Sequence, residues 1–194
     1  MNLPNKLTVM RMILVPFVVA ALLYPFPHHY LVALLLFAAA SYTDHLDGKI
    51  ARRDNLVTDF GKFMDPLADK VMVLSAMVCL VSLGFADVWI VVLMLAREFM
   101  VTSIRLVAVD KGRVIAANIW GKVKTVTQII AILGVLLLQY LLELESLELL
   151  PLPAGCAVIF GMTGDILLAV AAFFTVVSGL VYLRQNWDVI REGA

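Results

Sequence analysis

The sequence predicts an all-α integral membrane protein with six transmembrane helices and both termini in the cytoplasm. Of its 194 residues, 62% are hydrophobic and only 15% are charged, and the mean hydropathy is +0.97. In an ordinary soluble domain about a quarter of the residues are charged. The formal net charge is +0, so total charge gives no reason to expect a nucleic-acid partner.

Six apolar stretches are long enough to cross about 30 Å of hydrocarbon, which takes roughly 20 helical residues. The first follows Lys6 and superficially resembles a signal peptide, but Pro25 and Pro27 stand where a small-residue cleavage site would be expected. We therefore expect it to be retained as a span. With no linker and no evident repeat, residues 1–194 are expected to form a single membrane domain. The predicted spans are residues 7–24, 30–52, 60–83, 87–109, 119–142 and 165–184.

Basic residues are distributed on alternate connections. The connections after the first, third and fifth spans contain no Lys or Arg. By the positive-inside rule, the termini and the connections after the second and fourth spans face the cytoplasm. The basic residues on that side are Lys6, Arg53, Lys111, Arg113, Arg184 and Arg191.

The stretch 146–164 is apolar but repeatedly interrupted by Pro and Gly. We expect an outer loop that lies partly in the membrane interface, with Asp165 capping the last helix. A buried functional Asp165 is the alternative.

Carboxylates gather between the second and third spans, where the segment Asp44–Asp69 holds six of the fifteen acidic residues. An aspartate near the centre of a spanning helix costs roughly 2.5 to 3.5 kcal/mol, so the cluster needs compensation. Helical periodicity predicts two polar stripes that face each other across a hairpin. One consists of Asp44, Asp47, Gly48, Ala51 and Arg52, and the other of Gly61, Asp65 and Asp69.

Four converging carboxylates would repel one another unless protons or cations lie between them. Oxygen ligands favour Mg²⁺ or Mn²⁺, and His45 lies about 100° from Asp44 around the helix, outside this stripe. The alternative is a solvated hairpin whose acids pair with neighbouring basic residues. Those residues are Lys49, Arg52, Arg53, Lys62 and Lys70.

The spacing D-x-x-D-G-x-x-A-R, eight residues, then G-x-x-x-D-x-x-x-D resembles the signature of the CDP-alcohol phosphotransferase family. The resemblance implies a six-helix membrane enzyme, commonly a homodimer, that transfers a phosphoalcohol group from a CDP-linked donor to a hydroxyl and releases CMP. It implies two divalent cations, Mg²⁺ or Mn²⁺, held by Asp44, Asp47, Asp65 and Asp69, with Asp69 as general base.

The same resemblance implies a pocket for CDP-diacylglycerol. Thr8 and Arg11 are candidates for its phosphates, with interfacial anchoring as the alternative for both. The pocket residues are Asp47, Gly48, Ala51, Arg52, Gly61 and Thr8.

Four cations in the fourth and fifth spans suggest an acceptor that carries its own phosphate, because cations at membrane depth are expected to face a cavity or a negative partner. They are Arg97, Arg105, Lys122 and Lys124. Arg97 could instead pair with Glu98 or with the carboxylates. The two lysines lie about 200° apart on an ideal helix, so both reach one pocket only if their stems bend or the helix is just beginning.

The segments AREFMVTSIR and GKVKTVTQ resemble those of bacterial phosphatidylglycerophosphate synthases, whose acceptor is sn-glycerol 3-phosphate. The resemblance implies transfer of the phosphatidyl group from CDP-diacylglycerol, in the bacterial cytoplasmic membrane with the active site facing the cytoplasm. Inositol phosphate or phosphatidylglycerol as acceptor remains an alternative within the family. Outside it, the acidic cluster could belong to a divalent-cation transporter.

Overall fold

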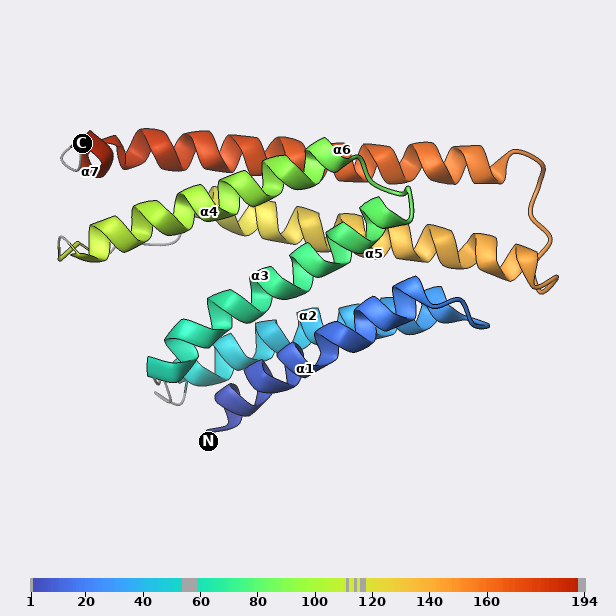
Figure 1. Ribbon diagram of the computed structural model, residues 1–194, viewed down its shortest axis with the longest axis horizontal. Helices are drawn as coiled ribbons and strands as arrows, with labels where there is room; N and C mark the ends of the chain where they lie inside the picture. The colour runs from blue at the N-terminus through green and yellow to red at the C-terminus, as the bar shows by residue number, and fades with distance from the viewer. Residues whose placement is uncertain (1, 54–58, 111, 114, 116–117, 192–194) are drawn as a thin grey trace.

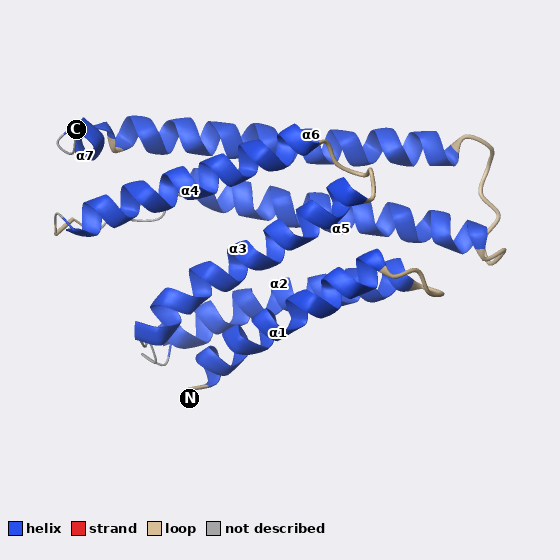
Figure 2. Ribbon diagram, viewed as in Figure 1, coloured by secondary structure: helices blue, strands red, loops and turns tan. Residues whose placement is uncertain are grey.

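The computed structural model describes residues 2–53, 59–110, 112–113, 115 and 118–191, and these form helices and connections without a strand (Figure 2). Within this part, the side chains of residues 3, 4, 44–53, 59, 60, 62, 63, 189 and 190 are outside the description. The helices are α1 (Leu3–Leu23), α2 (His29–Arg53), α3 (Asp59–Ser82), α4 (Val88–Asp110), α5 (Ile119–Ser146), α6 (Cys156–Gln185) and the short α7 (Trp187–Arg191). The all-α prediction is confirmed for the described residues.

The long helices run up and down along the molecule. Helix α1 packs against α2 and α3, α2 also contacts α5, and α6 packs against α4 and α5. Figure 1 shows the N-terminus, the ends of α2 and α4, and the C-terminus toward one end of the molecule. The connections from α1 to α2 and from α5 to α6 lie toward the other end.

Within the part of the chain that the structure describes, three helical segments are long and apolar enough to cross a membrane, namely Asn5–Leu23, Ile119–Ser146 and Cys156–Gln185. Their outward faces keep large apolar side chains exposed, as on α6 with Phe173 and Leu180. This is what a lipid-facing surface requires, and the protein is a membrane protein on these grounds. The predicted number of six spans and their orientation are not tested by these features.

Among the described residues, the main apolar cluster receives side chains from all six long helices, and a smaller one consists of Val101, Ile104 and Tyr182. Fully buried side chains include Phe37 of α2, Met77 of α3, Met94 of α4, Ile132 of α5 and Leu168 of α6. Because lipid is as apolar as these side chains, close packing rather than exclusion from water holds such helices together.

The predicted start of the last helix at residue 165 is wrong. Helix α6 begins nine residues earlier, at Cys156, after Gly155 in the left-handed region with φ 92°. Gly164 lies inside this helix and does not interrupt it. It allows α6 to pack closely on α5, since a Cβ at Gly164 would lie 3.4 Å from Val135 Cγ2. Asp165 is therefore an exposed residue inside α6, neither a cap nor a buried functional group.

Helix α5 also extends beyond its predicted end at residue 142. The carboxylate of Glu143 accepts hydrogen bonds from the backbone N–H groups of His29 at 2.9 Å and Tyr30 at 3.2 Å. Both N–H groups belong to the first turn of α2, where a negative charge is favourable, and that of His29 also donates to the Phe26 carbonyl oxygen at 3.1 Å. A residue of α5 thus caps α2 and joins the two helices.

Candidate active site

Two side chains of α1 form hydrogen bonds with two of the predicted carboxylates, which belong to α3. Thr8 Oγ1 donates to Asp65 Oδ1 at 2.5 Å, and Arg11 Nη1 donates to Asp69 Oδ1 at 2.9 Å. Thr8 and Arg11 are both 0% exposed. Interfacial anchoring therefore does not describe them, and α1 instead orients carboxylates on α3.

Besides its contact with Arg11, the Asp69 side chain also borders a cavity. Its side chain is 39% exposed and lines a cavity, so the carboxylate is both held and accessible. Gly61, Asp65 and Asp69 follow one another at intervals of four residues on α3, and Gly61 is buried. The third-span half of the predicted stripe pair is thus in place on one helix face.

The other half of that pair belongs to α2. The backbone of α2 is helical through all its positions, but the side chains of Asp44, Asp47, Gly48, Ala51 and Arg52 lie outside the described residues. The convergence of four carboxylates therefore stays a prediction. Of the basic partners considered in the solvated-hairpin alternative, Lys70 is described, and its ammonium donates to Thr102 Oγ1 at 2.5 Å.

A cavity of about 260 Å³ is lined mainly by α3, α4 and α5, with Ser41 of α2 and Tyr182 of α6 also in its wall. It brings Asp69 together with all four cations predicted for the acceptor phosphate. Its polar lining comprises Ser41, Asp69, Lys70, Arg97, Glu98, Thr102, Arg105, Asn118, Lys122, Lys124, Thr125, Gln128 and Tyr182.

Glu98 sits between two of these cations. Its Oε1 accepts from Arg97 Nη1 at 2.9 Å and from Lys124 Nζ, and Arg97 Nη2 donates to Ser178 Oγ at 2.6 Å. The side chains of Arg97, Glu98 and Lys124 are only 11%, 12% and 8% exposed. The alternative in which Arg97 pairs with Glu98 is confirmed, although both also line the cavity. Neutralisation within the triad offsets the desolvation of each charge.

Helix α6 makes room for Arg97. A Cβ on Gly179 would lie 3.1 Å from Arg97 Cγ, and one on Gly121 of α5 would lie 3.7 Å from Arg97 Nη2. The stem of Arg97 thus lies against Gly179 of α6 and its guanidinium against Gly121 of α5. An alanine at Gly179 would require that stem to shift by a few tenths of an ångström.

Both lysines of α5 reach the cavity because the helix has just begun. Asn118 caps α5, its side chain accepting from Trp120 N at 3.0 Å, and its Nδ2 donates to Gln185 Oε1 at 2.8 Å. Lys124 is buried in the triad, whereas Lys122 is exposed. The condition that the sequence set for two lysines in one pocket is thus met.

Arg105 lies at the Tyr182 side of the cavity. Its Nε donates to Tyr182 OH at 3.3 Å, and its guanidinium carbon is 5.7 Å from the ring centroid. Such a contact holds an arginine without neutralising it.

Sequence reasoning missed several polar residues of this cavity wall or of its support, among them Lys70, Thr102, Ser178 and Tyr182. Lys70 directly follows Asp69, so its membership could have been inferred from the same argument that singled out the other cations. Ser178 and Tyr182 lie more than a hundred residues along the chain from Asp69. Their only signal is a polar atom within an otherwise apolar helix.

The fold and the site together define a helical membrane protein that presents a carboxylate and a group of cations to one cavity. The chain belongs to the CDP-alcohol phosphatidyltransferase family, whose model matches residues 1–177. The predicted family membership is confirmed.

Three relatives show where in the family the similarity lies. The CDP-diacylglycerol–glycerol-3-phosphate 3-phosphatidyltransferase of Bacillus subtilis (strain 168) is 42% identical over 98% of this chain and 97% of that protein. The probable phosphatidylglycerophosphate synthase of Mycobacterium tuberculosis (strain H37Rv) is 38% identical, over 95% of this chain and 81% of that protein. The CDP-diacylglycerol–glycerol-3-phosphate 3-phosphatidyltransferase of Rickettsia bellii (strain RML369-C) is 34% identical over 94% of this chain and 94% of that protein.

Proposed function

We propose that this protein transfers the phosphatidyl group of CDP-diacylglycerol to sn-glycerol 3-phosphate and forms phosphatidylglycerophosphate and CMP. The observation that carries the proposal is that Asp69 and five Lys and Arg side chains line the same cavity. An acceptor with both a hydroxyl and a phosphate needs a base and cations within one small space. The names of the relatives support the same reaction.

In the proposed reaction, Asp69 takes the proton of the glycerol 1-hydroxyl. The hydroxyl oxygen forms a bond to the phosphorus that carries diacylglycerol, and the bond from that phosphorus to the oxygen of CMP breaks. Arg11 keeps the Asp69 carboxylate oriented through the 2.9 Å hydrogen bond, while the exposed part of the carboxylate faces the acceptor. The cavity cations hold the acceptor's phosphate.

The described part of the carboxylate group fits the proposed divalent cations. Asp65 and Asp69 supply carboxylate oxygens one helical turn apart on α3, which are the hard donors that Mg²⁺ and Mn²⁺ prefer. We propose that these residues, with Asp44 and Asp47, would hold two cations. When bound, the cations would neutralise the pyrophosphate of the donor and stabilise the leaving CMP. Asp47, Gly48, Ala51, Arg52, Gly61 and Thr8 remain the proposed pocket for CDP-diacylglycerol.

The proposed setting is one membrane domain over residues 1–194, with six spans, in the bacterial cytoplasmic membrane as a homodimer. The up-and-down order of the long helices supports an even number of crossings, with both termini on one side. Since Lys6, Arg113, Arg184 and Arg191 belong to the described segments at that same end, it is the proposed cytoplasmic face with the active site.

The deciding experiment measures CMP release by the purified protein with Mg²⁺ or Mn²⁺, CDP-diacylglycerol and one acceptor at a time. The acceptors are sn-glycerol 3-phosphate, inositol phosphate, phosphatidylglycerol and water alone. We expect release that depends on glycerol 3-phosphate. Preference for another acceptor would keep the family reaction and reject this acceptor, and no release with any acceptor would reject the reaction.

A further inference from the structure

The five cations of the cavity divide into two kinds. Arg97 and Lys124 are both committed to Glu98, and Arg97 is additionally bonded to Ser178. Among the residues that the structure describes, Lys70, Arg105 and Lys122 have no carboxylate within ion-pair distance. An incoming anion therefore meets its uncompensated positive charge at these three side chains rather than at the triad.

Lys70 differs from the other two in its position. It follows Asp69 on α3, so the proposed base and an uncompensated ammonium lie on adjacent residues, and both line the cavity. Arg105 and Lys122 are carried by α4 and α5. Of these three cavity cations, Lys70 is thus the one on the helix that carries Asp69.

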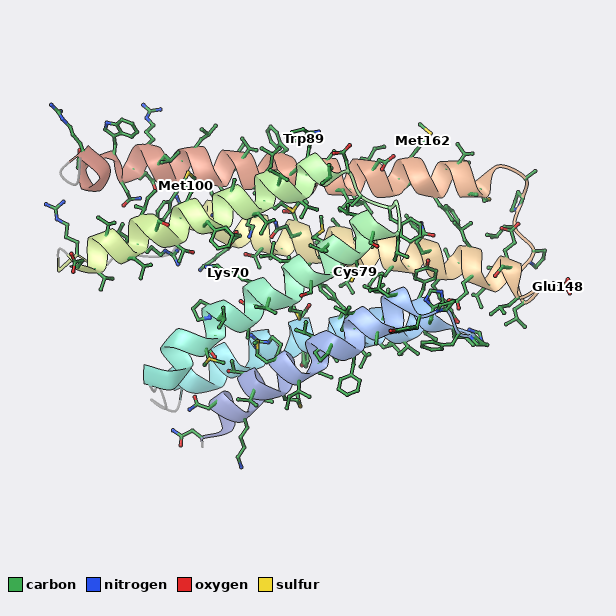
Figure 3. All side chains as sticks on the ribbon, in the orientation of Figure 1. Lys70, Cys79, Trp89, Met100, Glu148 and Met162 are labelled. Atoms are coloured by element: carbon green, nitrogen blue, oxygen red, sulfur yellow. The ribbon has the colours of Figure 1, made fainter. Side chains whose placement is uncertain are left out.

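The position of the Lys70 ammonium is fixed by Thr102. Lys70 projects from α3 toward α4, and its Nζ donates to Thr102 Oγ1 at 2.5 Å (Figure 3). The Thr102 hydroxyl donates its own hydrogen to the backbone carbonyl of Glu98 at 2.7 Å. The hydroxyl can then only accept from Lys70, which makes the arrangement directional. An ammonium has three hydrogens, and two remain for a ligand.

From this geometry we propose that Lys70 binds the acceptor's phosphate and thereby sets the acceptor hydroxyl beside Asp69, with Thr102 as its positioning residue. In this arrangement Lys70, Arg105 and Lys122 contact the phosphate. Arg97 and Lys124 stay paired with Glu98 and form part of the cavity wall. This inference rests on the proposed function for the identity of the acceptor. It changes which cations carry the binding.

The test uses Lys70→Met, which keeps the length of the stem and removes the charge, and Lys70→Arg, which keeps the charge. We expect Lys70→Met to raise the KM for glycerol 3-phosphate about 10- to 100-fold, the range for losing a hydrogen bond to a charged group. The KM for CDP-diacylglycerol should change by less than about twofold, and Lys70→Arg should recover most of the loss. Lys6→Met, an exposed lysine outside the cavity, is the matched control.

Thr102 supplies a second variant that leaves every charge in place. Thr102→Val removes the oxygen that accepts from Lys70, and we expect a smaller rise in the same KM, whereas Thr102→Ser, which keeps the hydroxyl, should recover most of that rise. A purely structural link between α3 and α4 would lower the melting temperature and leave the KM for glycerol 3-phosphate unchanged. That result in Lys70→Met, or equal rises in both KM values, would overturn the proposal.

Binding without turnover separates this inference from the proposed reaction. Titration calorimetry with glycerol 3-phosphate, and separately with inorganic phosphate, needs no donor. We expect Lys70→Met to weaken both at least tenfold even if the protein releases no CMP. Unchanged affinity for both anions would refute the role of Lys70 whether or not the transferase reaction is established.

Discussion

At the scale of single residues, Asp69 joins two roles that usually compete. Its carboxylate is fixed by Arg11, a fully buried cation, and yet the side chain is 39% exposed and lines the cavity. A base held by one oxygen has little freedom to turn away from its substrate.

Asp69→Asn should lower kcat by about 10²- to 10⁴-fold, the usual contribution of a general base, because an amide cannot take the hydroxyl proton. The measurement is CMP release with saturating CDP-diacylglycerol, glycerol 3-phosphate and Mg²⁺ or Mn²⁺. Asp165→Asn, which changes an exposed aspartate of α6, is the control and should keep full activity. Turnover by Asp69→Asn at the normal rate would mean that the proton goes elsewhere.

Among the variants considered, replacement of Glu98 should lower the free energy of unfolding most. Glu98→Gln leaves Arg97 and Lys124 as two buried cations without a carboxylate, and breaking a buried ion pair in this way costs about 3 to 5 kcal/mol. Thermal unfolding in detergent measures the loss. The double variant Glu98→Gln with Lys124→Met should lose less than the sum of the single variants, since it removes one stranded charge. Additive losses would show that the triad is not a unit.

Sequence reasoning reached the site unevenly, for physical reasons. The α3 aspartates and the four cations of α4 and α5 were predictable, because charges in apolar helices need an explanation and their spacing defines a face. The partners Ser178 and Tyr182 were not, since their contacts with Arg97 and Arg105 depend on how α6 packs on α4. Periodicity places a residue on a face but does not say which helix lies opposite.

At the scale of elements, the helices were predicted well where hydropathy changes sharply and poorly where small residues intervene. Helices α2, α3 and α4 begin and end within one residue of the predicted spans. The error at α6 came from interpreting Gly161 and Gly164 as breakers, although both lie inside the helix and Gly164 packs closely against Val135 of α5. Glycine that serves packing and glycine that ends a helix look alike in a single sequence.

The cap that α5 places on α2 is an element-scale prediction. Glu143→Gln keeps the shape of the side chain but weakens two hydrogen bonds and removes the charge at the start of α2. We expect a loss of about 1 to 2 kcal/mol in stability, the range for a helix cap, with little change in either KM. Glu145→Gln, two residues away and exposed, is the control. An equal loss in both variants would remove the cap as the cause.

At the scale of the whole molecule, the alternation of the six long helices places exposed residues at opposite ends. Glu148, labelled in Figure 3, lies in the connection between α5 and α6, whereas Asp188 lies in α7 near the C-terminus. If both termini are cytoplasmic, these two positions are separated by the membrane.

Single cysteines test that arrangement after Cys79 and Cys156 are replaced by serine. In intact cells, a membrane-impermeant maleimide should label cysteine introduced at Glu148 and should label the one introduced at Asp188 only after permeabilisation. The reversed pattern would invert the orientation. Labelling of both positions in intact cells would contradict an even number of crossings with cytoplasmic termini.

The contacts of Thr8 and Arg11 with the α3 aspartates have a practical consequence for handling this protein. They lie within the first two to three turns of α1, so the alignment of Asp65 and Asp69 depends on chain very close to the N-terminus. We expect a bulky fusion partner joined directly there to displace Thr8 and Arg11 and so to misalign the Asp69 carboxylate, while the rest of the fold remains intact. Affinity tags are better placed after α7, whose Trp187 is exposed and which packs against α4.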